Sequence, residues 1–241
     1  MEKMHFTSMD QGTVADFEVL KKVHEHTLEN LPNQLFVLLE NLAKDTAYNI
    51  TRKEPCLQTA TRALRDNKDD EYVVVALFHD IAEPLGPFNH GEVIASILHP
   101  FISRNNYWML VQHGLFQTYF YGDKLGLDPN ARDQYKSDPA YEQTVEFCAK
   151  YDEISFDPHY ISEPLATFDP IVRGVLKKKW VAPYTHLNHL KVVLFCRLTR
   201  QNRQLTTIPP ANATSDQPNS TQCRGSQCLL DTKSQHLKSI V

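Results

Sequence analysis

The stretch that most restricts the fold is the apolar run YVVVALF at residues 72–78, which Asp69, Asp70 and Glu71 precede. The run is apolar on every face, so it predicts a segment that neighbouring elements surround. Its β-branched composition would also suit a buried strand. We favour a helix over residues 69–80, because acidic residues stabilise the first turn of a helix and because the neighbouring segments have helical spacing.

Helical spacing of apolar residues recurs along the first 198 residues. Leu35, Leu39 and Leu42 lie on one face of a helix predicted over residues 13–44, with an interruption near Pro32. No alternation of Val and Ile is strong enough for a sheet, so the predicted fold class is all-α. Further helices are expected at residues 55–67, 89–99, 105–122, 139–156 with Asp138 as N-cap, 164–180 and 186–198.

The composition of the chain changes near residue 200. Residues 201–235 are rich in Ser, Thr, Asn, Gln and Pro and have few residues that could form a core, which predicts disorder. We therefore divide the chain into an N-terminal helical segment (1–44), a helical core (45–199) and a disordered tail (200–241).

Charge and cysteine content exclude several classes of protein. A net charge of −4 argues against a nucleic-acid partner. No apolar run reaches the ~18 residues that span a membrane, and no signal-peptide pattern begins the sequence, so we expect a cytoplasmic protein without a membrane partner. The five cysteines are scattered and odd in number, which indicates neither a disulfide framework nor a Cys-x-x-Cys metal motif.

A set of histidines and aspartates is the strongest candidate for a functional site. His79 and Asp80 are adjacent at the end of the apolar run, and a short loop rich in Pro and Gly returns the chain to His90. An aspartate can bridge two metal ions with its two oxygens, whereas a histidine gives one nitrogen to one ion. Together with His113 and Asp152 on later segments, these residue types suit iron, manganese or zinc.

Several motifs, taken in order, resemble those of the HD-domain superfamily. They are RKEPCLQTATRA at residues 52–63, the His-Asp pair, NHGE at 89–92, His-Gly at 113–114 and Tyr-Asp at 151–152. Within that superfamily the chain is most similar to the branch of mixed-valent di-iron oxygenases, whose best-known members cleave hydroxylated aminoalkylphosphonates. The resemblance covers about residues 45–180 and implies an HD-domain helical bundle with the metal site in a central cleft.

The resemblance also implies a ligand set. One iron would be held by His79, Asp80 and Asp152 and the other by Asp80, His90 and His113, with Asp80 as the bridge and the central catalytic residue. The implied cofactors are an Fe²⁺/Fe³⁺ pair, with manganese or zinc as alternative metals, and the implied partners are O₂ and a small hydroxylated substrate. Substrate contacts are expected from Tyr48, Gln58, Gln117 and Tyr121, and Glu92 is expected to accept a ligand imidazole N–H or to be a first-turn helix acid.

Two positions depart from the family's pattern. The family has its first ligand histidine where this chain has Pro55, and the neighbouring Cys56 is turned ~100° away on a helix. One iron site therefore lacks a ligand. Members that cleave phosphonates have a Lys-Arg pair one turn after the last ligand histidine, where this chain has Gln117 and Thr118. These neutral side chains cannot neutralise a dianion.

Three functions remain open from the sequence. The favoured one is a di-iron oxygenase, impaired by the loss of one ligand, because His90 and His113 add a second metal site. The second is an HD-type metal-dependent phosphohydrolase, with Arg52, Arg62, Arg65 and Lys124 as basic residues that could bind phosphate. The third is a non-catalytic HD-fold binding protein, which the proline at position 55 favours.

Overall fold

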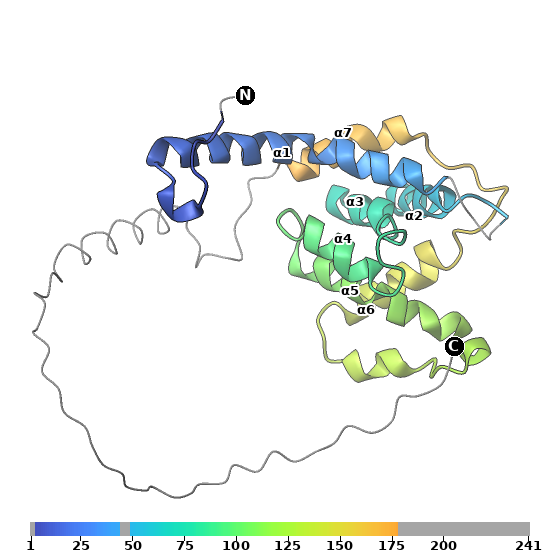
Figure 1. The fold of residues 1–241 in the computed structure, drawn as a ribbon. Coiled ribbons are helices and arrows are strands. Elements are labelled where there is room, and N and C mark those ends of the chain that lie inside the picture. Colours follow the sequence, from blue (N-terminus) through green and yellow to red (C-terminus); the bar gives the residue numbers. More distant parts are fainter. Residues whose placement is uncertain (1–2, 44–48, 178–241) are drawn as a thin grey trace, which may run out of the picture. The chain divides into compact units, whose positions relative to one another are not determined.

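The computed structural model describes residues 3–43 and 49–177 (Figure 1). This part of the chain is helical and contains no strand, which confirms the all-α class for it. None of its helices is long and apolar enough to cross a membrane. The helix predicted at 186–198 and the disorder predicted at 200–241 lie outside the described residues. The elements are η1 (Met9–Gln11), α1 (Val14–Asn41), α2 (Lys53–Arg65), α3 (Asp70–Phe78), α4 (His90–Leu98), α5 (Arg104–Tyr121), η2 (Gly122–Leu125), η3 (Ala131–Tyr135), α6 (Tyr141–Phe147), η4 (Cys148–Asp152) and α7 (Leu165–Leu176).

Helix α3 lies at the centre of this arrangement. All its residues from Tyr72 to Phe78 are buried, and it packs against α2, α5 and α7. The side chain of Asp69 caps its N-terminus by accepting a 2.9 Å hydrogen bond from the Tyr72 N–H. The choice of helix over strand for this run is confirmed, because the cap sets the start of the helix and the surrounding helices bury its β-branched side chains.

Helix α1 is continuous through Pro32, so the interruption predicted there is wrong. Proline inside a helix costs about 3 kcal/mol. Packing offsets this cost on both sides, because Leu31 contacts the core before the proline and Leu35 and Leu39 are buried after it. Leu35, Leu39 and Leu42 belong to the same core cluster as the side chains of α3, so the second half of α1 packs on the helical core.

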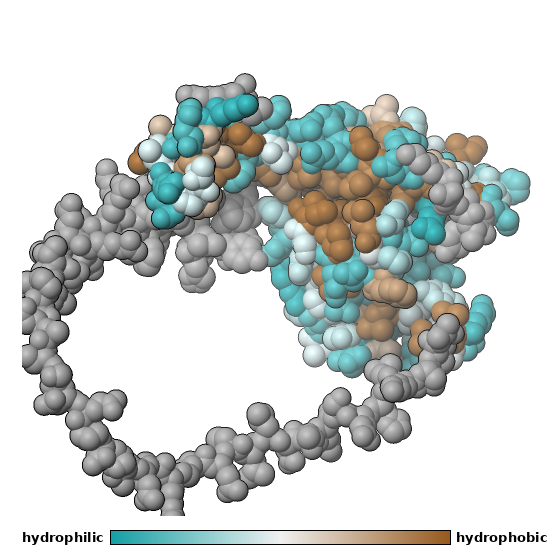
Figure 2. Space-filling model, in the orientation of Figure 1, coloured by the Kyte–Doolittle hydropathy of each residue, from teal (hydrophilic) through white to brown (hydrophobic). Residues whose placement is uncertain are grey.

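The outer side of α1 faces solvent, and the apolar side chains lie beneath it. On the face shown in Figure 2, hydrophobic side chains gather where α1, α3 and α4 lie in Figure 1, and hydrophilic side chains surround them. The helix that covers the core is therefore amphipathic in its second half, as the spacing of its leucines predicts.

The single helix predicted over residues 139–156 is two elements, α6 and the π-helical turn η4. The Asp138 side chain does accept a backbone hydrogen bond, but from the Ala140 N–H at 2.9 Å, and α6 begins one residue later. Arg104 holds Asp138 in this position through two contacts of 2.6 and 2.5 Å. The π turn ends at Asp152, and such turns are frequent at functional sites.

Candidate metal centre

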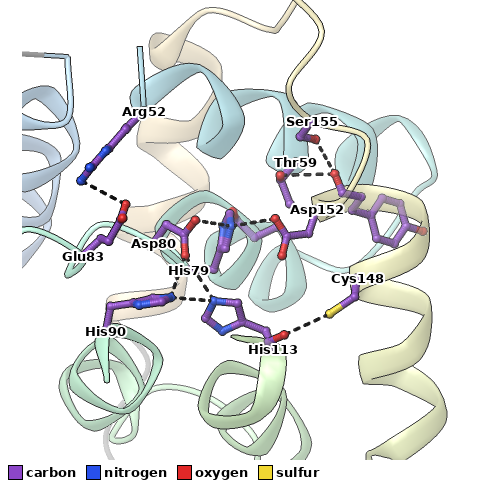
Figure 3. Close-up of polar contacts among 12 residues, drawn as sticks. Arg52, Thr59, His79, Asp80, Glu83, His90, His113, Cys148, Asp152 and Ser155 are labelled. Carbon is purple, nitrogen blue, oxygen red and sulfur yellow. Dashed lines mark hydrogen bonds and ion pairs between the residues drawn. The ribbon is translucent and has the colours of Figure 1, made fainter. Parts of the chain in front are cut away.

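Five side chains from four parts of the chain meet beside the end of α3 (Figure 3). His79 and Asp80 directly follow α3, His90 begins α4, His113 lies in α5, and Asp152 ends η4. Their ligand atoms form two groups, in each of which all atoms lie within 4.8 Å of one another. The groups are Asp80, His90, His113 and His79, Asp80, Asp152, the two sets that the resemblance implies.

The carboxylate of Asp80 gives one oxygen to each group. Its Oδ2 lies 3.2 Å from His79 Nε2, and its Oδ1 lies 3.1 Å from His90 Nε2 and 3.2 Å from His113 Nε2. On the far side of His79, Nε2 is 3.2 Å from Asp152 Oδ1. Asp80 is therefore placed between the two groups in the way that a bridging carboxylate requires.

All three imidazoles are oriented by the same local contact. Each Nδ1 lies near the backbone carbonyl three residues earlier, at 2.8 Å for His79, 3.2 Å for His90 and 2.7 Å for His113. A carbonyl oxygen can only accept, so Nδ1 is the donor and Nε2 presents its lone pair to the cluster. Glu92 is exposed and lies in the first turn of α4, as its alternative interpretation as a helix acid predicts, and the carbonyl of Pro87 rather than Glu92 accepts the His90 proton.

This donor set fits metal ions. His90 Nε2 and His113 Nε2 lie 3.1 Å apart, and both face Asp80 Oδ1. With the protons on Nδ1, these three atoms are all acceptors. In the described part of the chain, His79 Nε2 and both carboxylate oxygens of Asp152 are buried without a well-aligned hydrogen-bond partner. Buried acceptors that face one another are unfavourable unless a cation lies among them.

The charges of the cluster also favour bound positive charge. Burial alone would lower the pKa of His79, but the carboxylates of Asp80 and Asp152 outweigh it and hold that pKa well above its ordinary value. Burial would raise the pKa of Asp80, but the charge of a protonated His79, together with hydrogen bonds that protonated imidazoles donate, holds it well below its ordinary value. Either protons on the imidazoles or metal cations would offset the two carboxylates; with neutral imidazoles the charge of the cluster is about −2, which bound metal cations would balance.

The cluster opens to solvent on one side. The side chains of His79, Asp152 and His113 are 0%, 1% and 3% exposed. Those of His90 and Asp80 are 20% and 28% exposed. A small molecule would therefore reach the centre from the side of Asp80 and His90.

Two buried hydroxyl groups fix the backbone just before Asp152. The carbonyl oxygen of Tyr151 accepts a 3.3 Å hydrogen bond from Thr59 Oγ1 of α2 and another from Ser155 Oγ (Figure 3). Thr59 and Ser155 are both fully buried. The π turn is thus hydrogen-bonded to α2 at Tyr151, the residue before Asp152.

Replacing Thr59 with Val is expected to loosen this attachment at nearly constant volume. The Tyr151 carbonyl loses one donor, so we expect a loss of about 1–3 kcal/mol in the free energy of unfolding. Metal affinity at the His79–Asp80–Asp152 group should fall as well. Thr61→Val is the matched control, because the equally buried Thr61 hydroxyl accepts from the Glu163 N–H, away from the ligands. Denaturant titration and metal titration of both variants measure the two effects, and equal metal affinity would contradict the assignment.

Gly91 allows α4 and α5 to approach each other beside two ligands. A Cβ at this position would clash with the Leu110 carbonyl and would lie 3.0 and 3.1 Å from the ring of His113. Gly91→Ala is therefore expected to lower the free energy of unfolding by about 1–3 kcal/mol and to displace His113. Gly114→Ala is the control, because a Cβ there meets nothing within 4 Å. In the middle of α5 that change should stabilise the protein by about 0.5–1 kcal/mol. Thermal unfolding of the two variants measures this difference in sign.

Position 55 lies in the first turn of α2, and both Pro55 and Cys56 are buried. The Cys56 thiol is close to the cluster, since the Asp80 backbone N–H interacts with it. Burial raises its pKa to about 12, so it is a neutral thiol. The thiolate is the form that binds metals. Cys56 is also absent from both groups of converging ligand atoms, as its direction on the helix predicts.

The four residues expected to contact substrate have different positions. Gln58 is buried, and its amide donates to the Asp157 carbonyl at 2.7 Å and accepts from the Asp157 N–H at 3.3 Å. Gln58 therefore holds the segment after η4 in place. Because its amide is already hydrogen-bonded on both sides, the structure does not support a substrate contact from it. Gln117 and Tyr121 are half-buried and lie one and two turns after His113 on the same side of α5. Tyr48 lies outside the described residues.

Sequence reasoning missed the contacts that orient the ligands. The carbonyl acceptors of the imidazoles, the hydroxyl of Thr59 and the thiol of Cys148, which donates to the His113 carbonyl at 3.5 Å, form no motif. The one available sequence signal concerns the imidazoles, because the carbonyl that accepts from each ring belongs to the residue three positions before that histidine.

Comparison with known proteins identifies no family. A scan of the chain against protein-family models finds no matching model, and a search of curated proteins finds no match.

Proposed function

We propose that this chain is a metal-dependent HD-domain protein that binds two iron ions and oxidises a small hydroxylated organic substrate with O₂. The observation that supports this most is the position of Asp80. One of its oxygens faces His79 and the other faces His90 and His113. Carboxylates in such positions bridge metal ions ~3.5–4 Å apart.

The composition of the second group favours an oxygenase. Asp80, His90 and His113 form a set of two histidines and one carboxylate, which in other proteins holds non-haem iron with open coordination positions. Bound iron would supply the redox chemistry that O₂ activation requires. Manganese or zinc would fit the same nitrogen and oxygen ligands, so the identity of the metal is part of the proposal.

The chain's own residues have the remaining tasks. The Nδ1–H contacts hold each imidazole with Nε2 toward the centre. Phe147 lies edge-on to His79, with ring centroids 5.5 Å apart, and is fully buried, so it keeps water away from the inner side. The substrate would be bound and oriented at the outer side, beside Asp80 and His90.

The phosphohydrolase alternative has less support, because three of its four candidate phosphate ligands, all except Arg52, have other contacts or no contact with the cluster. Arg62 donates to the Ile154 carbonyl and stacks over the ring of Tyr160 at 3.9 Å. Arg65 pairs with Glu163 at 2.8 Å. Lys124 is exposed, and no contact in the described chain joins it to the cluster.

Metal content and oxygen uptake test the proposal together. The purified protein is reconstituted anaerobically with ferrous iron, analysed for metal, and then assayed for O₂ consumption and for phosphate release against panels of small hydroxylated compounds and phosphate esters. Bound iron with substrate-dependent O₂ consumption is the expected result. Phosphate release without O₂ uptake would replace the oxygenase with a phosphohydrolase, and no bound metal would leave the non-catalytic binding protein.

A further inference from the structure

An ion pair lies at the open side of the metal cluster. Glu83 follows Asp80 by three residues, and its N–H donates to the Asp80 carbonyl at 3.0 Å. Its Oε2 lies 3.3 Å from Nη1 of Arg52, the residue before α2. Figure 3 shows this pair on the side of Asp80 and His90 and away from Asp152. The pair therefore borders the route by which a substrate would reach the centre.

The guanidinium of Arg52 is only partly satisfied by this pair. Its Nε is buried and has no hydrogen-bond partner in the described chain. A single contact of 3.3 Å joins it to Glu83, whereas Arg104 holds Asp138 with two contacts of 2.5 and 2.6 Å. A guanidinium has five donors that match a carboxylate in a two-point contact. Within residues 3–43 and 49–177, Glu83 is the acidic partner of Arg52, so the Nη atoms rather than the buried Nε have donors left that could reach a second anion.

The cations of α2, the helix that directly follows Arg52, have partners of their own. Lys53 pairs with Glu40 at 2.7 Å and Arg65 with Glu163 at 2.8 Å. The half-buried Gln117 and Thr118, which follow His113 on α5, are neutral. In the part of the chain that the structure describes, Arg52 is therefore the cation that an anionic substrate would meet beside Asp80 and His90.

We propose that Arg52 is the anion-binding residue of this site and that it binds the carboxylate of a small 2-hydroxy acid in place of Glu83. A carboxylate suits the two-point contact that a guanidinium offers. A singly charged group is favoured over a phosphonate dianion, because Glu83 adds a negative charge nearby and, among residues 3–43 and 49–177, no ion pair gives this position a second cation. Placing the substrate hydroxyl at the metal ions rests on the proposed function, whereas the carboxylate contact rests on Arg52 alone.

Glycolate, the simplest 2-hydroxy acid, is the probe. Its affinity is measured by calorimetric titration of the full chain, anaerobically, with and without bound iron, beside neutral glycolamide and hydroxymethylphosphonate. We expect glycolate to bind more tightly than both. Arg52→Gln should weaken glycolate binding by about tenfold to hundredfold, as the loss of a charged hydrogen-bond pair does. Arg52→Lys should recover part of that loss, and Glu83→Gln should tighten binding by releasing Arg52.

Arg65→Gln is the matched control, because it removes an ion pair of the same kind from the other end of the same helix. It should leave glycolate affinity unchanged. Equal affinity in Arg52→Gln and the unmodified chain would overturn the assignment, and tighter binding of hydroxymethylphosphonate would overturn the carboxylate class. Metal analysis of the same samples separates the two proposals. Glycolate binding that depends on Arg52 in the metal-free protein would support the anion site even if the metal proposal failed.

Discussion

If the proposed centre binds two metal ions, replacing Asp80 with Asn is expected to remove both at once. The amide keeps the shape of the side chain but has one weak ligand oxygen in place of two charged ones, so neither group of ligands remains complete. Loss of a direct ligand should weaken metal binding by at least the 10–100-fold that loss of an outer contact costs, and here it affects both ions. Elemental analysis after reconstitution should show about two ions in the unmodified chain and essentially none in the variant.

Two further variants make this prediction specific. Asp152→Asn should affect only the ion beside His79, because Asp152 belongs to that group alone. Glu92→Gln should change nothing, because the exposed Glu92 lies two residues after His90 but has no role in orienting it. A chain with Asn at position 80 that still binds two ions would show that Asp80 is not the bridge.

His79, Asp80 and His90 could be proposed from the sequence because their signals are local, whereas His113 and Asp152 were implied by the order of motifs in the resemblance. His79 and Asp80 are adjacent, and His90 follows after one short loop, so the order of motifs is readable without a structure. Helix α3 was equally readable, since acids, a cap and an apolar run stand next to one another. In both cases the residues that determine the feature lie within about three turns of each other.

The features that the sequence did not reveal depend on contacts between distant residues. Thr59 and Tyr151 are 92 residues apart, and no local pattern predicts that a hydroxyl of α2 fastens the π turn. The continuity of α1 through Pro32 has the same origin, because tertiary packing outweighs the local preference of proline. Gln58 resembled a polar residue of a site, yet its amide binds the Asp157 backbone 99 residues away.

Replacing Pro55 with His is expected to raise the affinity for the metal ion beside His79. In the proposed centre that ion would have three protein ligands, His79, Asp80 and Asp152, and the resemblance places a fourth at position 55. Helix α2 passes close to the cluster, since the Asp80 N–H interacts with the thiol of the neighbouring Cys56. An added imidazole should raise metal affinity about tenfold or more, by comparison with the 10–100-fold effect of weaker outer contacts. Competitive titration against a chelator measures it.

Pro55→Ala is the control, because it removes the proline without adding a ligand. If the alanine variant gained affinity equally, relief of the backbone restriction rather than ligation would be the cause. If neither variant gained and the unmodified chain already bound two ions, three protein ligands would be sufficient and the proline would be compatible with an intact centre. If only the histidine variant bound a second ion, the centre would be shaped for two metals but unable to retain both, and the oxygenase activity would be expected in that variant alone.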